Sequence, residues 1–252
     1  MKLEGLTVLD LSLFLPGPAA TQIMADHGAR IIKVENPRAP EPTRSADAFP
    51  WQQGDETVMF RNTQRGKESI ALDLKTDAGK HALLALAKTV DVVVEAFRPG
   101  VAERLGIDYA TLSQDNPGLV YCSISAFGQT GPWCNRPAHD TATVAAAGVL
   151  DVTRSPEGSS GPAIIGVPIA DMLASNLALS GILMALLRRQ TTGQGDFVDI
   201  SMFESVLAAS PNIMGPVFGG DQAPERLKER THGGNAMLNV YETADAQYLV
   251  LG

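Results

Sequence analysis

The chain has 252 residues, 44% of them hydrophobic, and a formal net charge of −8. This size and apolar content allow one large domain with a sizeable core, or a domain and part of another. The acidic balance leaves no basic face to replace phosphate counterions, so we expect no nucleic-acid partner. Cys122 and Cys134 lack the spacing of a disulfide framework or a structural metal site, so we expect a cytoplasmic setting and no metal.

Short apolar runs alternate with helix-like runs in the first half of the chain. Strands are predicted at residues 6–12, 30–35, 69–74, 91–97 and 118–125, and helices at 19–29 and 76–90. Apolar strands separated by helices are typical of a parallel sheet with helices packed on it. We therefore expect an α/β fold with a Rossmann-like sheet. Residues 36–64 are rich in proline and polar residues, which predicts a long surface excursion.

Residues 166–187 form the most apolar long stretch, and Asp171 is its one acid. Proline is best tolerated in a first helical turn, so Pro168 predicts a helix start with Asp171 in or just after that turn. Asp171 and Asn176 would be costly inside a bilayer. We therefore expect a buried helix of a soluble protein, with no membrane partner.

The last part of the chain reads as the start of a second domain. A strand is predicted at 196–202, a connector at 211–232, and a hairpin-like pair of strands at 238–252. We expect a large catalytic domain at 1–210, followed by the connector and the beginning of a smaller α+β domain at 233–252. Because the sequence stops on a strand, we expect it to be part of a longer product.

Pattern alone leaves the role of Asp171 open. An acid in a first helical turn gains about 0.3–1 kcal/mol from the helix macrodipole, so a structural role competes with a catalytic one. His139 could exchange protons near neutral pH with Asp140 orienting it, but adjacent residues rarely face the same way, so the pattern favours a buried or capping histidine. Cations near turns could form a rim for phosphates at the carboxyl ends of the strands. These are Arg38, Arg65, Lys67, Lys75, Arg98 and Arg104.

No nucleotide-binding glycine motif accompanies the predicted sheet. The first strand is followed by "LFLPGPAA" rather than G-x-G-x-x-G, and the sequence contains no G-x-x-x-x-G-K-[ST]. Both motifs work by presenting backbone amides to phosphates, so the sequence disfavours a nicotinamide or P-loop nucleotide site.

Four blocks together resemble one known family. They begin "GLTVLDLSLFLPGPAATQIM", "RGKESIALDLKTDAGK", "PAHD" and "GVPIADMLASNLALSG", and they cover nearly all of residues 4–206. In order and spacing they are similar to the class III CoA-transferases of CaiB/BaiF type, which include formyl-CoA transferase, carnitine CoA-transferase and the alpha-methylacyl-CoA racemases.

The resemblance implies an enzyme that moves CoA between carboxylic acids. Asp171 would be the catalytic carboxylate, passing through an aspartyl anhydride and an aspartyl-CoA thioester, and the helix start would keep it ionised. The implied partners are an acyl-CoA and a carboxylic acid, with coenzyme A as co-substrate and no tightly bound cofactor. The family also implies an interlocked homodimer for the full-length protein.

The same resemblance implies a set of CoA contacts. They are Leu15, Pro16, Arg38, Leu72, Asp73, Leu74, Lys75, Ala96, Phe97, Arg98 and Arg104. The sequence departs from the family at two places near these contacts. Ala96 stands where asparagine is usual, and Asn36 stands where an arginine often follows the strand.

Two further functions are weighed against the transferase. A racemase would use His139 and Asp171 as a two-base pair that removes and returns the proton alpha to a thioester. The racemases usually follow the aspartate with glycines, whereas "MLASN" follows Asp171, so we favour the transferase. A non-catalytic acyl-CoA-binding protein is the remaining alternative.

Overall fold

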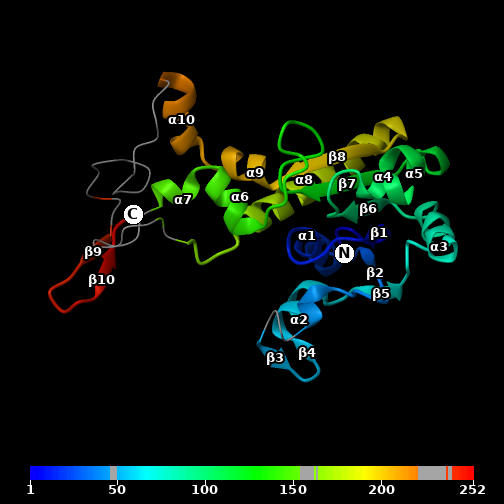
Figure 1. The fold of residues 1–252 in the computed structure, drawn as a ribbon, viewed down its shortest axis with the longest axis horizontal. Helices are drawn as coiled ribbons and strands as arrows, with labels where there is room; N and C mark the ends of the chain where they lie inside the picture. Colours follow the sequence, from blue (N-terminus) through cyan, green and yellow to red (C-terminus); the bar gives the residue numbers. More distant parts are fainter. Residues whose placement is uncertain (46–49, 154–161, 163, 221–236, 238–239) are drawn as a thin grey trace.

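The computed structural model describes residues 1–45, 50–153, 162, 164–220, 237 and 240–252. Its centre is a six-stranded sheet of order β5-β2-β1-β6-β7-β8, in which all neighbouring strands are parallel (Figure 1). The strands are β1 (Thr7–Asp10), β2 (Arg30–Glu35), β5 (Glu68–Ala71), β6 (Val92–Glu95), β7 (Val120–Ser125) and β8 (Asp196–Ser201). The Rossmann-like sheet is thus confirmed. The strand order reverses between β1 and β6, which is where ligands bind in open α/β sheets.

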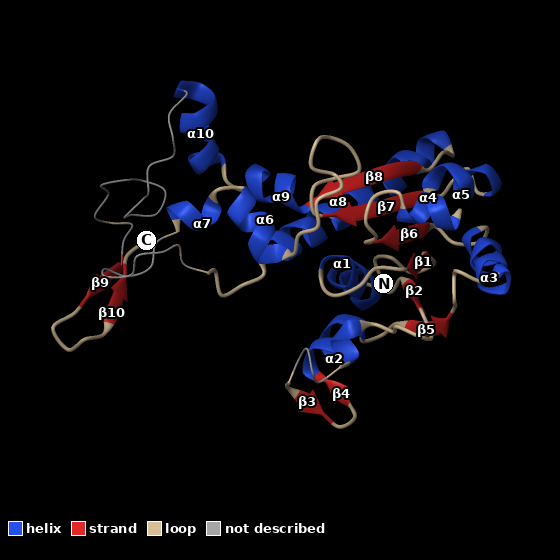
Figure 2. Ribbon diagram, in the orientation of Figure 1, coloured by secondary structure: helices blue, strands red, loops and turns tan. Residues whose placement is uncertain are grey.

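Helices cover both faces of the sheet (Figure 2). Val8, Val92 and Val94 point to one face and pack in one core with α1 (Pro16–Asp26) and α8 (Ile169–Thr192). Leu9 and Val93 point the other way and pack in a second core. That core is closed by α3 (Asp77–Ala87), α4 (Val101–Leu105) and α5 (Tyr109–Asp115). Because side chains alternate along a strand, runs such as "VVVE" supply both cores.

Residues 36–64 depart from the predicted surface excursion. They include the short helix η1 (Pro42–Arg44), the strands β3 (Gln52–Gln53) and β4 (Glu56–Thr57), and the helix α2 (Val58–Gln64). Thr57 caps α2 by accepting a hydrogen bond from the Phe60 amide, and Phe60 is buried. Glu41 is buried as well. The predicted surface excursion thus contains short elements that were not predicted, because one capping threonine and one buried apolar residue are too weak a signal for a short helix.

Helix α8 begins one residue after Pro168 and ends at Gly193, and Asp171 lies in its first turn as predicted. By length and composition alone it could cross a membrane. In the fold it packs against α1, α9 (Met202–Ala208), β7 and β8, with Ala170, Ala174 and Ile182 fully buried. The predicted buried helix is therefore buried on this face only, because Leu177, Met184 and Leu187 on another face are exposed.

The C-terminal part lies at the opposite end of the molecule from β5 (Figure 1). The strands β9 (Val240–Glu242) and β10 (Tyr248–Val250) pair antiparallel, which confirms the predicted hairpin. The predicted connector begins instead with a helix, α10 (Pro211–Gly220). Its remainder, 221–232, lies outside the described residues. Two short helices, α6 (Asp140–Ala146) and α7 (Val149–Val152), precede α8.

Candidate active site

The predicted CoA contacts gather at one edge of the sheet. Leu15 and Pro16 follow β1, Arg38 follows β2, residues 72–75 follow β5, and residues 96–98 follow β6. Since these four strands are neighbours and parallel, their carboxyl ends lie side by side. Arg38 Nε lies 3.6 Å from Asp73 Oδ2, which links two of these segments directly.

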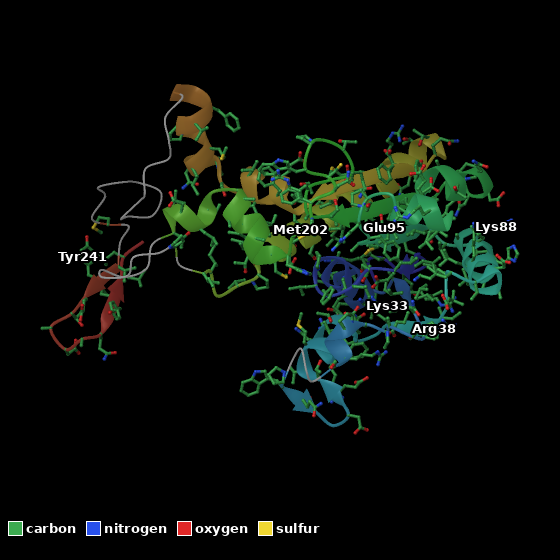
Figure 3. The ribbon with its side chains drawn as sticks, viewed as in Figure 1. Lys33, Arg38, Lys88, Glu95, Met202 and Tyr241 are labelled. Atoms are coloured by element: carbon green, nitrogen blue, oxygen red, sulfur yellow. The ribbon has the colours of Figure 1, made fainter. Side chains whose placement is uncertain are left out.

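The individual side chains of this edge differ in exposure. Pro16 is buried as the first residue of α1, and Leu15 is its N-cap. Leu72, Asp73, Leu74, Ala96 and Phe97 are half-buried. Lys75, Arg98 and Arg104 are exposed, as is Arg38, and Arg104 stands in the last turn of α4. Figure 3 shows Lys33 and Arg38 on the β2 side and Glu95 on the β6 side. This edge of the sheet therefore carries exposed cations beside half-buried side chains.

Asp140 caps the helix that carries Asp171. Its Oδ1 accepts hydrogen bonds from the Ala170 amide at 2.7 Å and from the Asp171 amide at 3.2 Å. These amides belong to the first turn of α8, where backbone donors have no partner within the helix. Asp140 itself begins α6, so one carboxylate joins the starts of two helices.

Asp171 titrates far from its ordinary range in this position. Burial, and then the like charge of Asp140, raise the pKa of Asp171 to about 7. We expected the helix start to keep this carboxylate ionised, and the structure corrects that expectation. The macrodipole favours the charged form, but desolvation and a second carboxylate beside it outweigh that influence.

His139 and Asp140 contact different parts of the fold although they are adjacent in the sequence. His139 is the N-cap residue of α6 and is exposed, and its ring meets the edge of the Phe14 ring at a centroid distance of 5.7 Å. Asp140 turns toward α8 instead. The carboxylate therefore does not orient the imidazole. Through Phe14, His139 connects the start of α6 to the loop after β1.

The loop after β1 has an unusual backbone conformation and is held by the buried side chains of Glu41 and Lys33. Phe14 has φ 63°, in the left-handed region that non-glycine residues seldom occupy. Its amide donates to Glu41 Oε1 at 3.0 Å, and Lys33 Nζ donates to the carbonyl of Ser12. Lys33 and Glu41 form an ion pair of 3.2 Å, and both side chains are buried. One buried ion pair thus fixes the loop at two points.

Sequence reasoning missed this network of buried charges. Asp10 lies 3.0 Å from Lys67 Nζ and 3.8 Å from Lys33 Nζ. Burial opposes ionisation of Asp10, yet the two ammonium groups hold the pKa of Asp10 below its usual range. Burial lowers the pKa of Lys67. A signal was available, because Asp10 and Lys33 interrupt otherwise apolar strands, and buried charges need partners.

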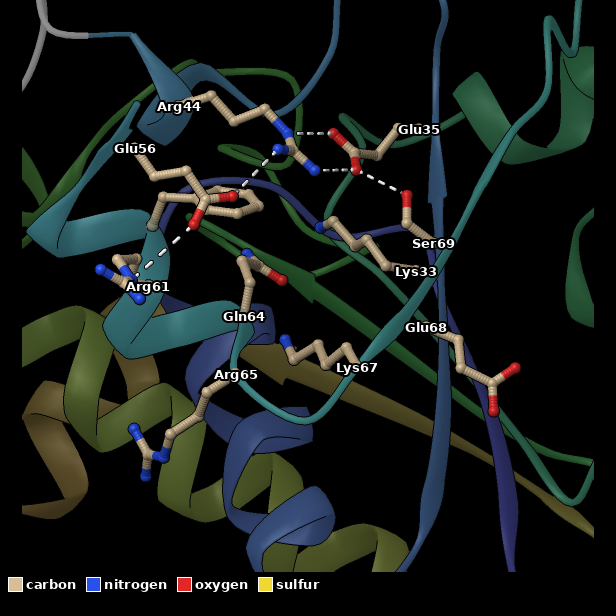
Figure 4. A pocket seen from close by; sticks show the side chains of 11 residues that line it. Lys33, Glu35, Arg44, Glu56, Arg61, Gln64, Arg65, Lys67, Glu68 and Ser69 are labelled. Carbon is tan, nitrogen blue, oxygen red and sulfur yellow. Dashed lines mark hydrogen bonds and ion pairs between the residues drawn. The ribbon is translucent and has the colours of Figure 1, made fainter. Parts of the chain in front are cut away.

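A polar pocket of about 360 Å³ lies between α2 and the strands β2 and β5 (Figure 4). None of the predicted CoA contacts or catalytic residues lines it, although Arg65 and Lys67 of the predicted cation rim do. Other charged groups of the pocket are matched to one another, since Arg44 pairs with Glu35 at 2.8 Å and with Glu56 at 3.7 Å. The pocket is therefore a neighbour of the candidate site and not part of it.

Comparison with known proteins points to one family. Residues 3–252 match the model of CoA-transferase family III. The chain is 37% identical over 247 residues to acetyl-CoA:oxalate CoA-transferase of Acetobacter aceti, covering 98% of this chain and 62% of that protein. It is also 37% identical over 255 residues to succinyl-CoA–D-citramalate CoA-transferase of Chloroflexus aurantiacus, covering 99% and 61%.

Solved structures agree with these relatives. A CaiB/BaiF family protein from Brucella suis has 32% sequence identity and a TM-score of 0.87, over 98% of this chain and 65% of that one. The chain spans about three fifths of the length of the two curated relatives.

Proposed function

Because this chain belongs to CoA-transferase family III, we propose that the protein transfers coenzyme A from an acyl-CoA to a carboxylic acid, with Asp171 as its nucleophile. The observation that carries the proposal is the setting of Asp171. It is a poorly solvated carboxylate in the first turn of α8, and its capping partner Asp140 neighbours the His139 that touches the loop after β1. A desolvated carboxylate is a stronger nucleophile than one in water.

In the proposed reaction the donor acyl group and then the acceptor acyl group are bound covalently to the carboxylate of Asp171. Asp171 attacks the thioester carbon of the donor, and the CoA thiolate leaves to give a mixed anhydride. The thiolate then attacks the aspartyl carbonyl, which expels the donor acid and forms an aspartyl-CoA thioester. The acceptor carboxylate displaces the thiolate to form a second anhydride, and the thiolate attacks the acceptor's acyl carbon, which restores Asp171. Each step breaks one acyl bond as it forms another, and the overall exchange of one thioester for another is close to energetically neutral.

The edge of the sheet supplies what CoA requires. Arg38, Lys75, Arg98 and Arg104 are exposed cations, and phosphate groups are recognised by lysine and arginine through charge-assisted hydrogen bonds. Half-buried Leu72 and Phe97 offer apolar surface beside them. We assign CoA to this edge as a co-substrate that enters and leaves.

The function of the relatives limits the substrate class. The two curated relatives are named for acetyl-CoA with oxalate and for succinyl-CoA with D-citramalate. We infer a short-chain acyl-CoA donor and a small carboxylic acid as acceptor. The interlocked homodimer that the family resemblance implies, and the cytoplasmic location expected from the two cysteines, complete the proposal for the whole protein.

One incubation tests the activity. The protein is supplied with acetyl-CoA or succinyl-CoA and a panel of oxalate, glutarate and D-citramalate in heavy water, and products are read by mass spectrometry. CoA on the second acid is the expected result. A parallel incubation contains an alpha-methylacyl-CoA of one configuration, and deuterium at its alpha carbon with scrambled stereochemistry would show the racemase reaction instead. Neither transfer nor deuterium exchange would support the acyl-CoA-binding protein.

Substitutions at Asp171 and His139 test the proposed role of each residue. We expect Asp171→Ala to lower the rate of CoA transfer by about 10³-fold or more, because the nucleophile is lost. The exposed Asp77 offers a control, and Asp77→Asn should leave the rate unchanged. His139→Phe should preserve transfer, whereas a two-base racemase would lose its activity. Normal transfer by Asp171→Ala would refute the nucleophile assignment.

A further inference from the structure

The loop after β1 leads directly to two of the predicted CoA contacts. Residues 11–15 connect β1 to α1, and Leu15 and Pro16 stand where the loop becomes the helix. Phe14 and Ala246 are the non-glycine residues with positive φ among those that the structure describes. Ala246 lies in the turn of the β9–β10 hairpin, where positive φ is common. Phe14 instead adjoins the candidate active site.

The backbone conformation of Phe14 is unfavourable by itself. At positive φ the Cβ of an L-residue crowds a neighbouring carbonyl oxygen, which is why glycine usually takes this conformation. The base of the loop is also tightly packed, since a Cβ on Gly17 would lie 2.2 Å from Ser12 Cβ. Such a conformation persists only where the surrounding structure stabilises it.

Glu41 supplies the stabilising contact. Its Oε1 accepts the Phe14 amide at 3.0 Å, and the same oxygen accepts the amide and the hydroxyl of Thr43 at 3.3 and 3.1 Å. Its Oε2 lies 3.2 Å from Lys33 Nζ, and the side chain of Glu41 is completely buried. A hydrogen bond to a carboxylate is stronger than one between neutral groups, so Glu41 can offset the cost of positive φ at Phe14.

The segment that carries Glu41 is itself anchored to the sheet. The Glu41 amide donates to Glu35 Oε2 at 3.1 Å, and Glu35 is the last residue of β2. Arg44 binds the same carboxylate through two hydrogen bonds of 2.8 and 3.0 Å. Since β2 pairs with β1, the position of Glu41 is fixed relative to the strand from which the loop departs.

We infer that Glu41 is a positioning residue for coenzyme A, which holds Phe14 at positive φ and thereby sets where Leu15 and Pro16 meet the ligand. Glu41 is buried, and this role needs no contact between Glu41 and CoA. The inference rests on the proposed function, because that proposal assigns CoA to this edge of the sheet.

Two substitutions separate the acceptor oxygen of Glu41 from its charge. Glu41→Gln and Glu41→Leu both remove the carboxylate charge, but glutamine keeps an oxygen that can accept the Phe14 amide. The dissociation constant of CoA is measured by isothermal titration calorimetry on the full-length protein. We expect Glu41→Leu to weaken CoA by about 5-fold or more, and Glu41→Gln by about 2-fold or less. Glu56→Leu removes a partly exposed carboxylate at residues 36–64 and should not change the affinity.

Steady-state kinetics distinguish a displaced loop from a general loss of stability. A displaced loop raises KM for the acyl-CoA in Glu41→Leu, while kcat and KM for the acceptor acid stay within about 2-fold. General destabilisation lowers the amount of active enzyme, which reduces kcat and leaves both KM values unchanged. A fall in kcat without a rise in KM for the acyl-CoA would overturn the inference.

Phe14 offers a second test that leaves the core intact, and this test applies even if Glu41→Leu does not fold. Phe14→Ala and Phe14→Pro both remove a partly exposed ring. Proline in addition has no amide hydrogen and cannot take φ 63°. We expect Phe14→Pro to bind CoA about 5-fold or more weakly than Phe14→Ala. Equal affinity of these two variants, or of Glu41→Leu and the unaltered protein, would overturn the inference.

Failure of this inference and failure of the proposed function give different results. CoA transfer by the unaltered protein, with CoA affinity that none of these changes affects, would overturn the role of Glu41 alone. CoA binding with the expected differences, but without transfer to any acid, would support the role of Glu41 and refute the transferase. No binding of CoA by the unaltered protein would contradict both.

Discussion

Asp171, the proposed nucleophile, lies beside Asp140, the carboxylate that caps its helix and opposes its charge. Asp140 is needed at the start of α8 because the Ala170 and Asp171 amides have no other acceptor within the helix. The same carboxylate makes ionisation of Asp171 less favourable, in addition to burial. A carboxyl that titrates near neutrality can be ionised for attack and is a better nucleophile than one of ordinary pKa.

The pH dependence of transfer follows from this arrangement. With the pKa of Asp171 raised to about 7, the carboxyl is protonated below that pH and cannot attack. We therefore expect kcat/KM to rise with pH through about 7 and to fall toward acid. Asp140→Asn keeps an oxygen to cap α8 but removes the like charge, so the inflection should move to lower pH. His139→Gln serves as the control, and an inflection equally placed in all three proteins would contradict this assignment.

The buried ion pair between Lys33 and Glu41 leads us to predict a change in the free energy of unfolding. Lys33→Met leaves the buried Asp10 and Glu41 without that partner, and breaking a buried pair in this way costs about 3–5 kcal/mol. Arg30, on the same strand, pairs with Glu68 on the surface, where solvent screens the pair, so Arg30→Met should leave stability nearly unchanged. Urea unfolding of both variants provides the comparison. Equal small losses would show that the buried pair does not hold the loop after β1.

At the scale of elements, strands β7 and β8 approach too closely for a side chain at Gly195. A Cβ there would lie 1.9 Å from the carbonyl oxygen of Leu119. We expect Gly195→Ala to lower the free energy of unfolding by about 1–3 kcal/mol, because the backbone must move apart. At Gly215 in α10 nothing lies within 4 Å of an added Cβ, so Gly215→Ala should be neutral or stabilising. A denaturant melt in which Gly195→Ala behaves like Gly215→Ala would rule out the steric argument.

The elements were predictable where periodicity is strong. "VVVE" and "RIIKVE" are apolar enough to predict buried strands of a parallel sheet, and Pro168 marked the start of α8 within one residue. Helix α2 was missed because its seven residues show too little periodicity. The connector was missed at α10 for a similar reason, since prolines and glycines at 211–220 argue against a helix.

The candidate site was predictable only in part. The resemblance and the helix start together singled out Asp171. The capping contact of Asp140 spans 30 residues of sequence, and no local pattern encodes such a contact. The hydrogen bond from the Phe14 amide to Glu41 likewise joins residues that are 27 positions apart in the sequence. Long-range hydrogen bonds between loops depend on the finished fold, so the sequence alone suggests only the adjacent His139 as a partner of Asp140.

At the scale of the whole molecule, α8 leaves an apolar stripe uncovered. Leu177, Leu183, Met184 and Leu187 are 41%, 39%, 66% and 66% exposed and follow helical spacing along one side. Contiguous exposed apolar surface marks an interaction site in soluble proteins. The stripe supports the proposed interlocked homodimer, in which it would be covered.

Light scattering after gel filtration tests the assembly. We expect the full-length protein to have the mass of a dimer, and Met184→Glu with Leu187→Glu to shift it toward the monomer, because charge in an apolar interface is costly. A monomeric mass for the unaltered protein would contradict the homodimer.

In the proposed reaction, Asp171 carries the acyl groups covalently. The direct measurement uses an acceptor acid labelled with ¹⁸O in its carboxylate, with acetyl-CoA as donor and mass spectrometry of the peptide that contains Asp171. The bridging oxygen of the second anhydride comes from the acceptor and stays on the enzyme when the thiolate departs with the acyl group. We predict that the peptide gains about 2 Da, one ¹⁸O atom, on Asp171 in a single turnover, and that further turnovers raise the gain toward about 4 Da because either carboxylate oxygen can be replaced. Product formation with no label on Asp171 would contradict the account.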